Sequence, residues 1–215
     1  DRRAAYKPRG GGFTFFEWYE QVDLDGPEVA RMIRTLKEKG VHVDATLIVF
    51  YLNFFGDQAA IRDADLALAP PALVANWRAG FRFDAGWKPE DYRRAQAVWP
   101  KVLKLTRMLH EAGVPMTLGT DMANPFTAPG VSLSREMELH RQAGIPAWAV
   151  LRMATSDAAR ILGLDRRTGR ISPGYEADAV FLKADPRRDM AAMRQVAAVL
   201  NDGVLLDPEA LKRGG

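Results

Sequence analysis

The sequence predicts an α/β fold with a parallel sheet, because short apolar runs alternate with amphipathic helical segments. Three runs are apolar enough to be buried strands, at residues 13–19, 41–50 and 114–118. The composition, 47% apolar and 27% charged, is that of a globular chain. In such folds ligands bind beyond the carboxyl ends of the strands, so functional residues are expected just after Phe50 and just after Leu118.

A predicted helix follows each of these strands. The first helix starts after the N-cap Asp25 and ends near Gly40, with apolar residues at helical spacing between them. The second covers residues 99–111. The third is capped by Ser132 or Ser134 and carries acidic residues in its first turn.

The stretch after the second strand is too long for a simple connection. We expect a helical insertion at about residues 52–98, on the ligand-facing rim. Its aromatic rings either form a small core of their own or line a substrate pocket. They are Phe54, Phe55, Trp77, Phe81, Phe83, Trp87 and Tyr92.

The pattern changes near Gly163 from helical spacing to alternation with a period of two. We therefore expect one part at residues 1–163, with the insertion, and a small β domain at residues 164–215. The elements predicted around this boundary are helices at 147–153 and 155–162 and short strands at Ile171, 179–182, 196–200 and 204–206, the last two forming a hairpin.

Composition and missing motifs exclude several classes of protein. With no cysteine, the chain has no disulfide framework, thiol nucleophile or cysteine zinc site. The 30 basic and 27 acidic residues are interspersed, so we expect no nucleic-acid partner. The most apolar stretch, residues 45–55, is shorter than the roughly 20 residues a bilayer requires, so we expect no membrane partner. Neither a G-x-S-x-G elbow nor a glycine-rich nucleotide loop occurs.

Asp121 is the candidate catalytic residue, because its carboxylate comes just past a predicted buried strand and follows Gly119, which permits a close turn. An aspartate there can bind a metal, act as a general base, or do both, and it can also simply cap a turn. The histidines, His42, His110 and His140, lie away from the predicted carboxyl ends of strands and are not expected to bind metal.

Several motifs support one family resemblance. Residues 119–121 read Gly-Thr-Asp, and residues 169–180 fit Gly-x-Ile-x-Pro-Gly-x-x-Ala-Asp-x-Val. On these motifs the chain resembles the C-terminal part of the amidohydrolase superfamily, in particular the imidazolonepropionase-like metal-dependent hydrolases. Shorter matches occur in the same order at Ala112-Gly113-Val114, Arg135-Glu136-Met137-Glu138-Leu139, Ala143-Gly144-Ile145, Ala154-Thr155 and Asn201-Asp202-Gly203.

The resemblance implies a hydrolase that cleaves an amide, cyclic amide or other C–N bond of a small-molecule substrate. It implies the last three units of a (β/α)8 TIM-type barrel, followed by strands of a small β-sandwich domain, with a divalent metal, usually zinc, at the barrel mouth. Asp121 is then both a metal ligand and the general acid/base that relays one proton from a water to the leaving group.

The chain also departs from the family pattern. The family's other metal ligands lie upstream of Asp1, and the aligned segment 13–20 has Glu17-Trp18 where a histidine is expected. A metal needs roughly three protein ligands, so we expect a fragment that is inactive by itself, with Glu17 structural rather than a substitute ligand. Two alternatives stay open: a non-catalytic barrel-derived scaffold or binding module, and a homo-oligomer in which truncated chains complete a barrel.

Overall fold

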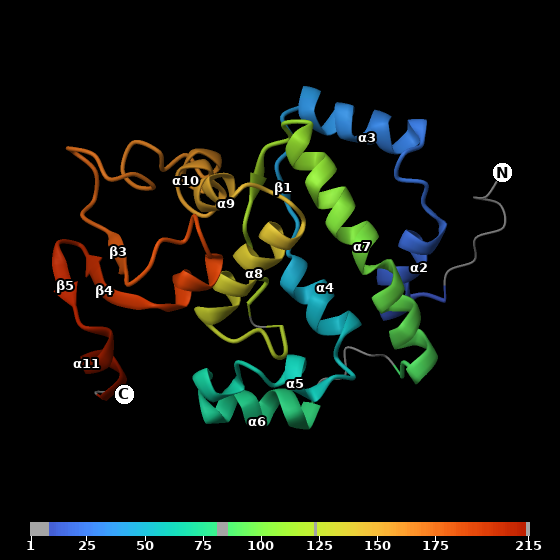
Figure 1. The fold of residues 1–215 in the computed structure, drawn as a ribbon, viewed down its shortest axis with the longest axis horizontal. Coiled ribbons are helices and arrows are strands. Elements are labelled where there is room, and N and C mark those ends of the chain that lie inside the picture. The colour runs from blue at the N-terminus through green and yellow to red at the C-terminus, as the bar shows by residue number, and fades with distance from the viewer. Residues whose placement is uncertain (1–8, 81–85, 123, 214–215) are drawn as a thin grey trace.

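The computed structural model describes residues 9–80, 86–122 and 124–213 (Figure 1). The elements before residue 112 are η1 (Gly11–Phe13), α2 (Thr14–Gln21), α3 (Pro27–Glu38), β1 (Val43–Asp44), α4 (Leu47–Phe54), α5 (Ala59–Arg62), η2 (Leu66–Leu68), α6 (Pro71–Gly80) and α7 (Pro89–Glu111), where η marks a 3₁₀ helix. They are followed by β2 (Met116–Thr117), α8 (Val131–Gln142), α9 (Ala147–Met153), α10 (Ser156–Ile161), β3 (Ala179–Leu182), η3 (Met190–Arg194), β4 (Val196–Asn201), β5 (Val204–Leu206) and α11 (Pro208–Arg213).

The strands β1 and β2 pair in parallel, with Val43 opposite Met116 and Asp44 opposite Thr117. Each of these strands follows a helix in the chain: α3 precedes β1, and α7 precedes β2 (Figure 1). Both helices pack beside the two-stranded sheet (Figure 1). Parallel strands alternating with helices confirm the predicted α/β fold. Within the described residues, every helix is too short or too polar to cross a lipid bilayer.

The strand predicted at residues 13–19 is wrong, because these residues form η1 and α2. Helical spacing brings Phe13 and Phe16 to the same side of the segment, where their rings lie 6.2 and 5.0 Å from that of Trp87. In a strand, residues three apart point to opposite faces, so the two rings could not share this partner. Packing against Trp87 therefore decides in favour of the helix.

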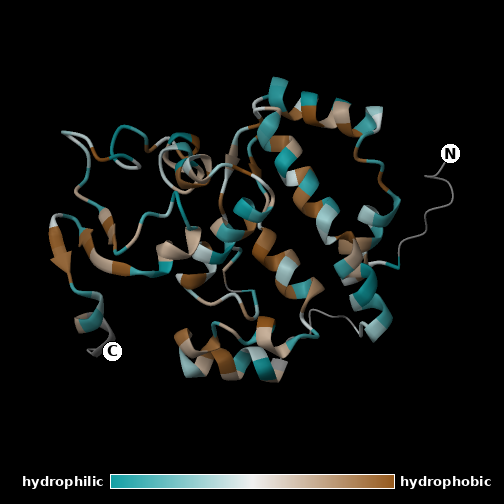
Figure 2. Cartoon of the chain, in the orientation of Figure 1, coloured by the Kyte–Doolittle hydropathy of each residue, from teal (hydrophilic) through white to brown (hydrophobic). Residues whose placement is uncertain are grey.

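The strand predicted at residues 41–50 is wrong beyond Asp44. Thr46 adopts a left-handed conformation with φ 44°, and α4 begins at Leu47. A short apolar run fits a buried strand and a buried helix equally well. Here the helix forms because α4, which is brown along much of its length in Figure 2, is buried in contact with α7 and α8.

The described part of residues 52–98 is largely helical. Its aromatic residues Phe54, Trp77 and Trp87 are buried, which supports their role as core residues, whereas Phe81 and Phe83 lie outside the described residues. The second predicted helix starts earlier than residue 99: α7 begins at Pro89, where the N–H of Lys88 donates to Asp91 Oδ2 at 3.0 Å.

Buried apolar residues of the described chain gather in separate clusters. One joins α3, β2, α8 and α9 and includes Ile33 and Met116. A second is aromatic, joins α2, α4 and α7, and includes Phe16 and Phe54. A third, around Trp77, joins α6 to the segment before α8. The strands β1 and β2 contribute Val43 and Met116 to the first of these clusters.

The C-terminal strands are confirmed at β3, β4 and β5, which form an antiparallel sheet in that order among the described residues. The hairpin of β4 and β5 turns at Asp202, which has φ 49°, and Gly203. Ile171 belongs to no strand and its side chain is 93% exposed. The strands of this sheet carry apolar side chains. A second layer of strands, which would make the domain a sandwich, stays a prediction.

Candidate active site

Two carboxylates mark the carboxyl edge of the parallel pair. Asp44 ends β1, and Asp121 follows β2 by four residues. The register places Asp44 beside Thr117, whose hydroxyl donates to Asp44 Oδ2 at 3.2 Å. Asp121 was predicted at this edge, whereas Asp44 was missed because the strand was expected to continue to Phe50. An aspartate two residues before Thr46, a common turn pattern, was the available signal.

The Asp44 carboxylate is held in a fixed position. Its Oδ1 accepts hydrogen bonds from the backbone N–H and the hydroxyl of Thr46, at 3.1 and 3.0 Å. A Cβ atom added to Gly119 would overlap the Asp44 carboxylate. Gly119 has no positive φ, so the neighbouring carboxylate rather than the backbone conformation demands glycine here.

Replacing Gly119 with alanine should therefore destabilise the protein by about 1–3 kcal/mol, because the new methyl group overpacks the edge of the sheet. Urea unfolding measures this loss. The matched control is the same substitution in an Asp44→Ala background, where the obstacle is gone and the penalty should shrink to a few tenths of a kcal/mol. An equal penalty in both backgrounds would contradict the assigned contact.

Asp121 is exposed and adopts a left-handed conformation with φ 48°. The side-chain amide of Asn124 donates to Asp121 Oδ2 at 2.5 Å and to its carbonyl oxygen at 3.0 Å. These bonds orient the carboxylate within a short turn. Asp121 also lines a cavity of about 450 Å³ whose other wall is supplied by α6, including Leu73 and Asn76.

Glu136 and His140 on α8 form a pair of fully buried side chains next to the start of α4. The backbone N–H groups of Leu47 and Ile48 donate to Glu136 Oε1 and Oε2 at 2.8 and 2.6 Å, so Glu136 caps the start of α4. His140 Nδ1 lies 3.2 Å from Glu136 Oε1, and His140 Nε2 has no hydrogen-bond partner among the described residues.

Burial sets the protonation of this pair. Burial raises the pKa of Glu136 to about 8, against the opposing effect of the two backbone N–H donors. Burial also lowers the pKa of His140 to about 4. The pair is therefore uncharged near neutral pH. From the sequence, Glu136 is expected only in the first turn of a helix. Its capping contact cannot be predicted from a local pattern, because the capped residue Ile48 lies 88 residues earlier in the chain.

Glu17 lies on α2, away from the Asp121 cavity. Its buried carboxylate accepts a hydrogen bond from Arg9 Nε at 2.6 Å, and Arg94 Nη2 lies 4.0 Å from it. The same Arg9 side chain pairs with Asp91 at 2.9 Å, which ties α2 to α7. These partners support the expected structural role of Glu17.

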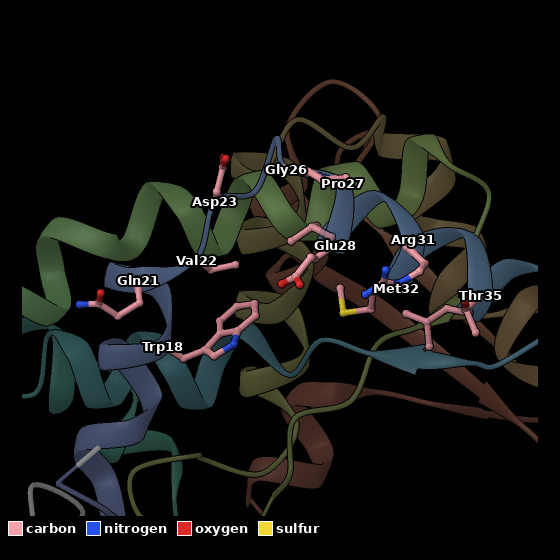
Figure 3. Close-up of a pocket in the computed structure, with 12 residues that line it drawn as sticks. Trp18, Gln21, Val22, Asp23, Gly26, Pro27, Glu28, Arg31, Met32 and Thr35 are labelled. Atoms are coloured by element: carbon pink, nitrogen blue, oxygen red, sulfur yellow. The ribbon is translucent and has the colours of Figure 1, made fainter. Parts of the chain in front are cut away.

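A second hollow of about 660 Å³ lies between α2 and α3. Figure 3 shows Trp18 on one side of it and Glu28 and Met32 of α3 on the other. Its lining comes from outer helices and not from the carboxyl ends of β1 and β2. This hollow is therefore a surface feature distinct from the edge that carries Asp44 and Asp121.

The donors present do not complete a metal centre. Across residues 9–80, 86–122 and 124–213, no three histidine, aspartate or glutamate side chains gather closely enough to hold an ion. The Asp121 carboxylate is a suitable oxygen donor, but a catalytic metal needs roughly three ligands from the protein. No catalytic step through a metal can be derived from these residues alone.

The chain belongs to the amidohydrolase family. Residues 14–206 match the model of the Amidohydrolase family, which confirms the superfamily predicted from the Gly-Thr-Asp and Gly-x-Ile-x-Pro-Gly motifs. The imidazolonepropionase of Rubrobacter xylanophilus is 38% identical over 106 residues, 47% of this chain and 25% of that protein. The ochratoxinase of Aspergillus niger is 30% identical over 116 residues, 53% of this chain and 23% of that protein. The chain spans about a quarter of the length of these relatives.

Solved structures superimpose on most of this chain. A bottromycin amidohydrolase superimposes with a TM-score of 0.63 and 29% identity over 80% of this chain and 38% of its own. The A. niger ochratoxinase crystal structure superimposes with a TM-score of 0.57 over 90% of this chain and 39% of its own, and at 23% identity it shows likeness of fold alone.

Proposed function

We propose that this chain is the C-terminal portion of a metal-dependent amidohydrolase that cleaves an amide, cyclic amide or other C–N bond of a small-molecule substrate. The observation that carries the proposal is Asp121: an oriented carboxylate just past β2, at the mouth of a cavity, in a chain of this family. The relatives named imidazolonepropionase and ochratoxinase support a hydrolase.

In this proposal Asp121 is one metal ligand, and the remaining ligands come from polypeptide outside the described residues. A bound divalent ion, zinc by our expectation, would lower the pKa of a water molecule toward neutrality. With such an ion in place, the Asp121 carboxylate would serve as the proton carrier: it would accept one proton from the water as the water oxygen bonds to the substrate carbon, and would return it to the nitrogen as the C–N bond breaks. The Asn124 amide keeps the carboxylate oriented for both transfers.

A second candidate function is a non-catalytic scaffold or binding module with this fold. The incomplete set of metal donors in the described residues favours it. The two candidates differ in what they predict for the protein together with its upstream polypeptide, because only the enzyme requires a completed metal site there.

Elemental analysis of that longer protein tests the proposal. We expect close to one zinc or more per chain and clear loss of metal in Asp121→Asn, because one ligand becomes a weaker neutral donor. Asp25→Asn is the matched control, since Asp25 is an exposed carboxylate that pairs only with Lys104 in the described structure and its loss should leave the metal content unchanged. A metal-free wild-type protein would support the scaffold.

A further inference from the structure

Two residues other than glycine adopt the left-handed backbone conformation just after the paired strands. Thr46, two residues after β1, has φ 44°, and Asp121, four residues after β2, has φ 48°. This conformation is unfavourable for a residue with a Cβ atom, above all for a β-branched threonine, so neighbouring groups must hold it. Because β1 and β2 run parallel, both turns lie at the same edge of the sheet.

Asp44 contacts the chain at both strand ends. On its own strand, Oδ1 accepts hydrogen bonds from the N–H and the hydroxyl of Thr46, at 3.1 and 3.0 Å. Across the sheet, Oδ2 accepts from the Thr117 hydroxyl at 3.2 Å. The carboxylate also lies against Gly119, where an added Cβ atom would come within 2.9 Å of Oδ1 and closer still to Oδ2. It thus fills the space between the two strand ends.

The start of α4 does not account for this arrangement. The Thr46 side chain makes no capping bond to α4. Glu136 instead accepts from the N–H groups of Leu47 and Ile48, which are the donors that a helix start leaves free. The contacts of Asp44 therefore serve the edge of the sheet and not the helix that follows it.

The turn from Gly119 to Asp121 is held at both ends. Asp44, itself fixed by Thr117, determines where Gly119 lies. At the other end, the Asn124 amide donates to Asp121 Oδ2 at 2.5 Å, and the Asn124 backbone N–H donates to the Asp121 carbonyl oxygen at 3.0 Å. The direction of the Asp121 carboxylate therefore depends on Asp44 as well as on Asn124.

We propose that Asp44 is a positioning residue: its carboxylate sets the place of Gly119 and, through this turn, the direction of the Asp121 carboxylate. The role depends on shape and hydrogen bonding, because Thr46 and Thr117 are neutral donors. Asparagine has the same shape, keeps an oxygen for Thr46 and can donate to the Thr117 hydroxyl, so it should replace Asp44. The inference rests on the proposed function for its catalytic meaning, whereas the orientation of Asp121 is measurable without turnover.

The Asn124 side-chain amide reports the direction of Asp121 in the ¹⁵N-labelled 215-residue chain. Its NMR signals, identified by their loss in Asn124→Ala, should shift in Asp44→Ala and return close to their wild-type positions in Asp44→Asn. The signals of Asn201, in β4, should stay in place in both variants, which excludes a general loss of the fold. Asp25→Ala, at an exposed aspartate, is the matched control and should leave the Asn124 signals unchanged.

Thr117→Val is a milder variant that tests the same contact. It removes the hydroxyl that donates to Asp44 and keeps the side-chain volume, so the Asn124 signals should move in the same direction as in Asp44→Ala but less far. Unmoved signals in Asp44→Ala would overturn the inference, and so would a shift in Asp44→Asn as large as that in Asp44→Ala. If Asp44→Ala does not fold, unmoved signals in Thr117→Val overturn it.

Kinetics of the longer protein separate this inference from the proposed function. Asp44→Ala should lower kcat by about tenfold to a hundredfold and leave KM nearly unchanged, because it misdirects the proton carrier without removing a group that binds substrate. Asp44→Asn should restore most of kcat. Normal kcat in Asp44→Ala would overturn the inference and leave the function standing. A wild-type protein without hydrolysis would overturn the function, while the Asn124 signals would still decide the inference.

Discussion

Asp121→Asn in the protein that includes its upstream region is expected to lower kcat for C–N bond hydrolysis by about 10²–10⁴-fold. Asparagine is nearly the same size but cannot accept and return a proton, and that relay is what a general acid/base contributes. Because Asp121 is exposed, the metal-free variant should unfold at nearly the same denaturant concentration as the metal-free wild type. Steady-state kinetics and urea unfolding measure the two effects separately.

Asn124→Ala tests how much the orientation of the Asp121 carboxylate contributes to kcat. It removes the amide that donates to Asp121 Oδ2 but keeps the carboxylate, so its loss of kcat should be smaller than that of Asp121→Asn. Normal turnover in Asp121→Asn would refute the assignment of this residue, whatever the companion shows.

Glu136→Ala is expected to destabilise the fold by about 3–5 kcal/mol at pH 5. The substitution leaves the N–H groups of Leu47 and Ile48 buried without acceptors and opens a cavity beside His140. Glu136→Gln retains one acceptor oxygen and nearly the full volume, so its loss should be roughly half as large. Urea unfolding gives both values. Equal losses in the two variants would show that capping is not the source of the stability.

The pH dependence of stability gives an independent check on Glu136. Its pKa is raised from 4.5 to about 8, so the folded chain keeps a proton that the unfolded chain releases between these values. The contribution of the protonated carboxyl is full below pH 4.5 and is lost as the pH rises toward 8. Above pH 6.5 the depressed pKa of His140 makes its own contribution constant.

Between pH 6.5 and 8, wild-type stability should therefore fall relative to Glu136→Ala by about 1 kcal/mol per pH unit. Parallel stability curves for the two proteins in this window would contradict the raised pKa of Glu136.

Local signals predicted α3, α9, α10 and the strands β3, β4 and β5 well. Pro27 and the residues spaced behind it mark α3, and α9 and β3 have the predicted bounds. In each case the residues that start, fill and end the element are neighbours in the sequence, so a local pattern contains the information. The same locality explains why Asp121 could be placed just past β2.

Short apolar segments could not be assigned in this way. The run that contains Phe16 becomes helical because its rings pack on Trp87, about 70 residues later. The chain leaves the sheet after Asp44 because α4 starts at Leu47, where Glu136 of α8 caps it. Both outcomes depend on partners that no window around the segment includes.

The sequence by itself determined the family, the candidate Asp121 and helices such as α3, α9 and α10, because ordered motifs and helical spacing are written in consecutive residues. Only the tertiary structure decided that Asp44 shares the edge of the sheet with Asp121, that Glu136 caps α4, and that α6 brings Asn76 to the cavity. The physical reason is that buried N–H groups and apolar surfaces must find partners in space, and those partners lie far away in the chain.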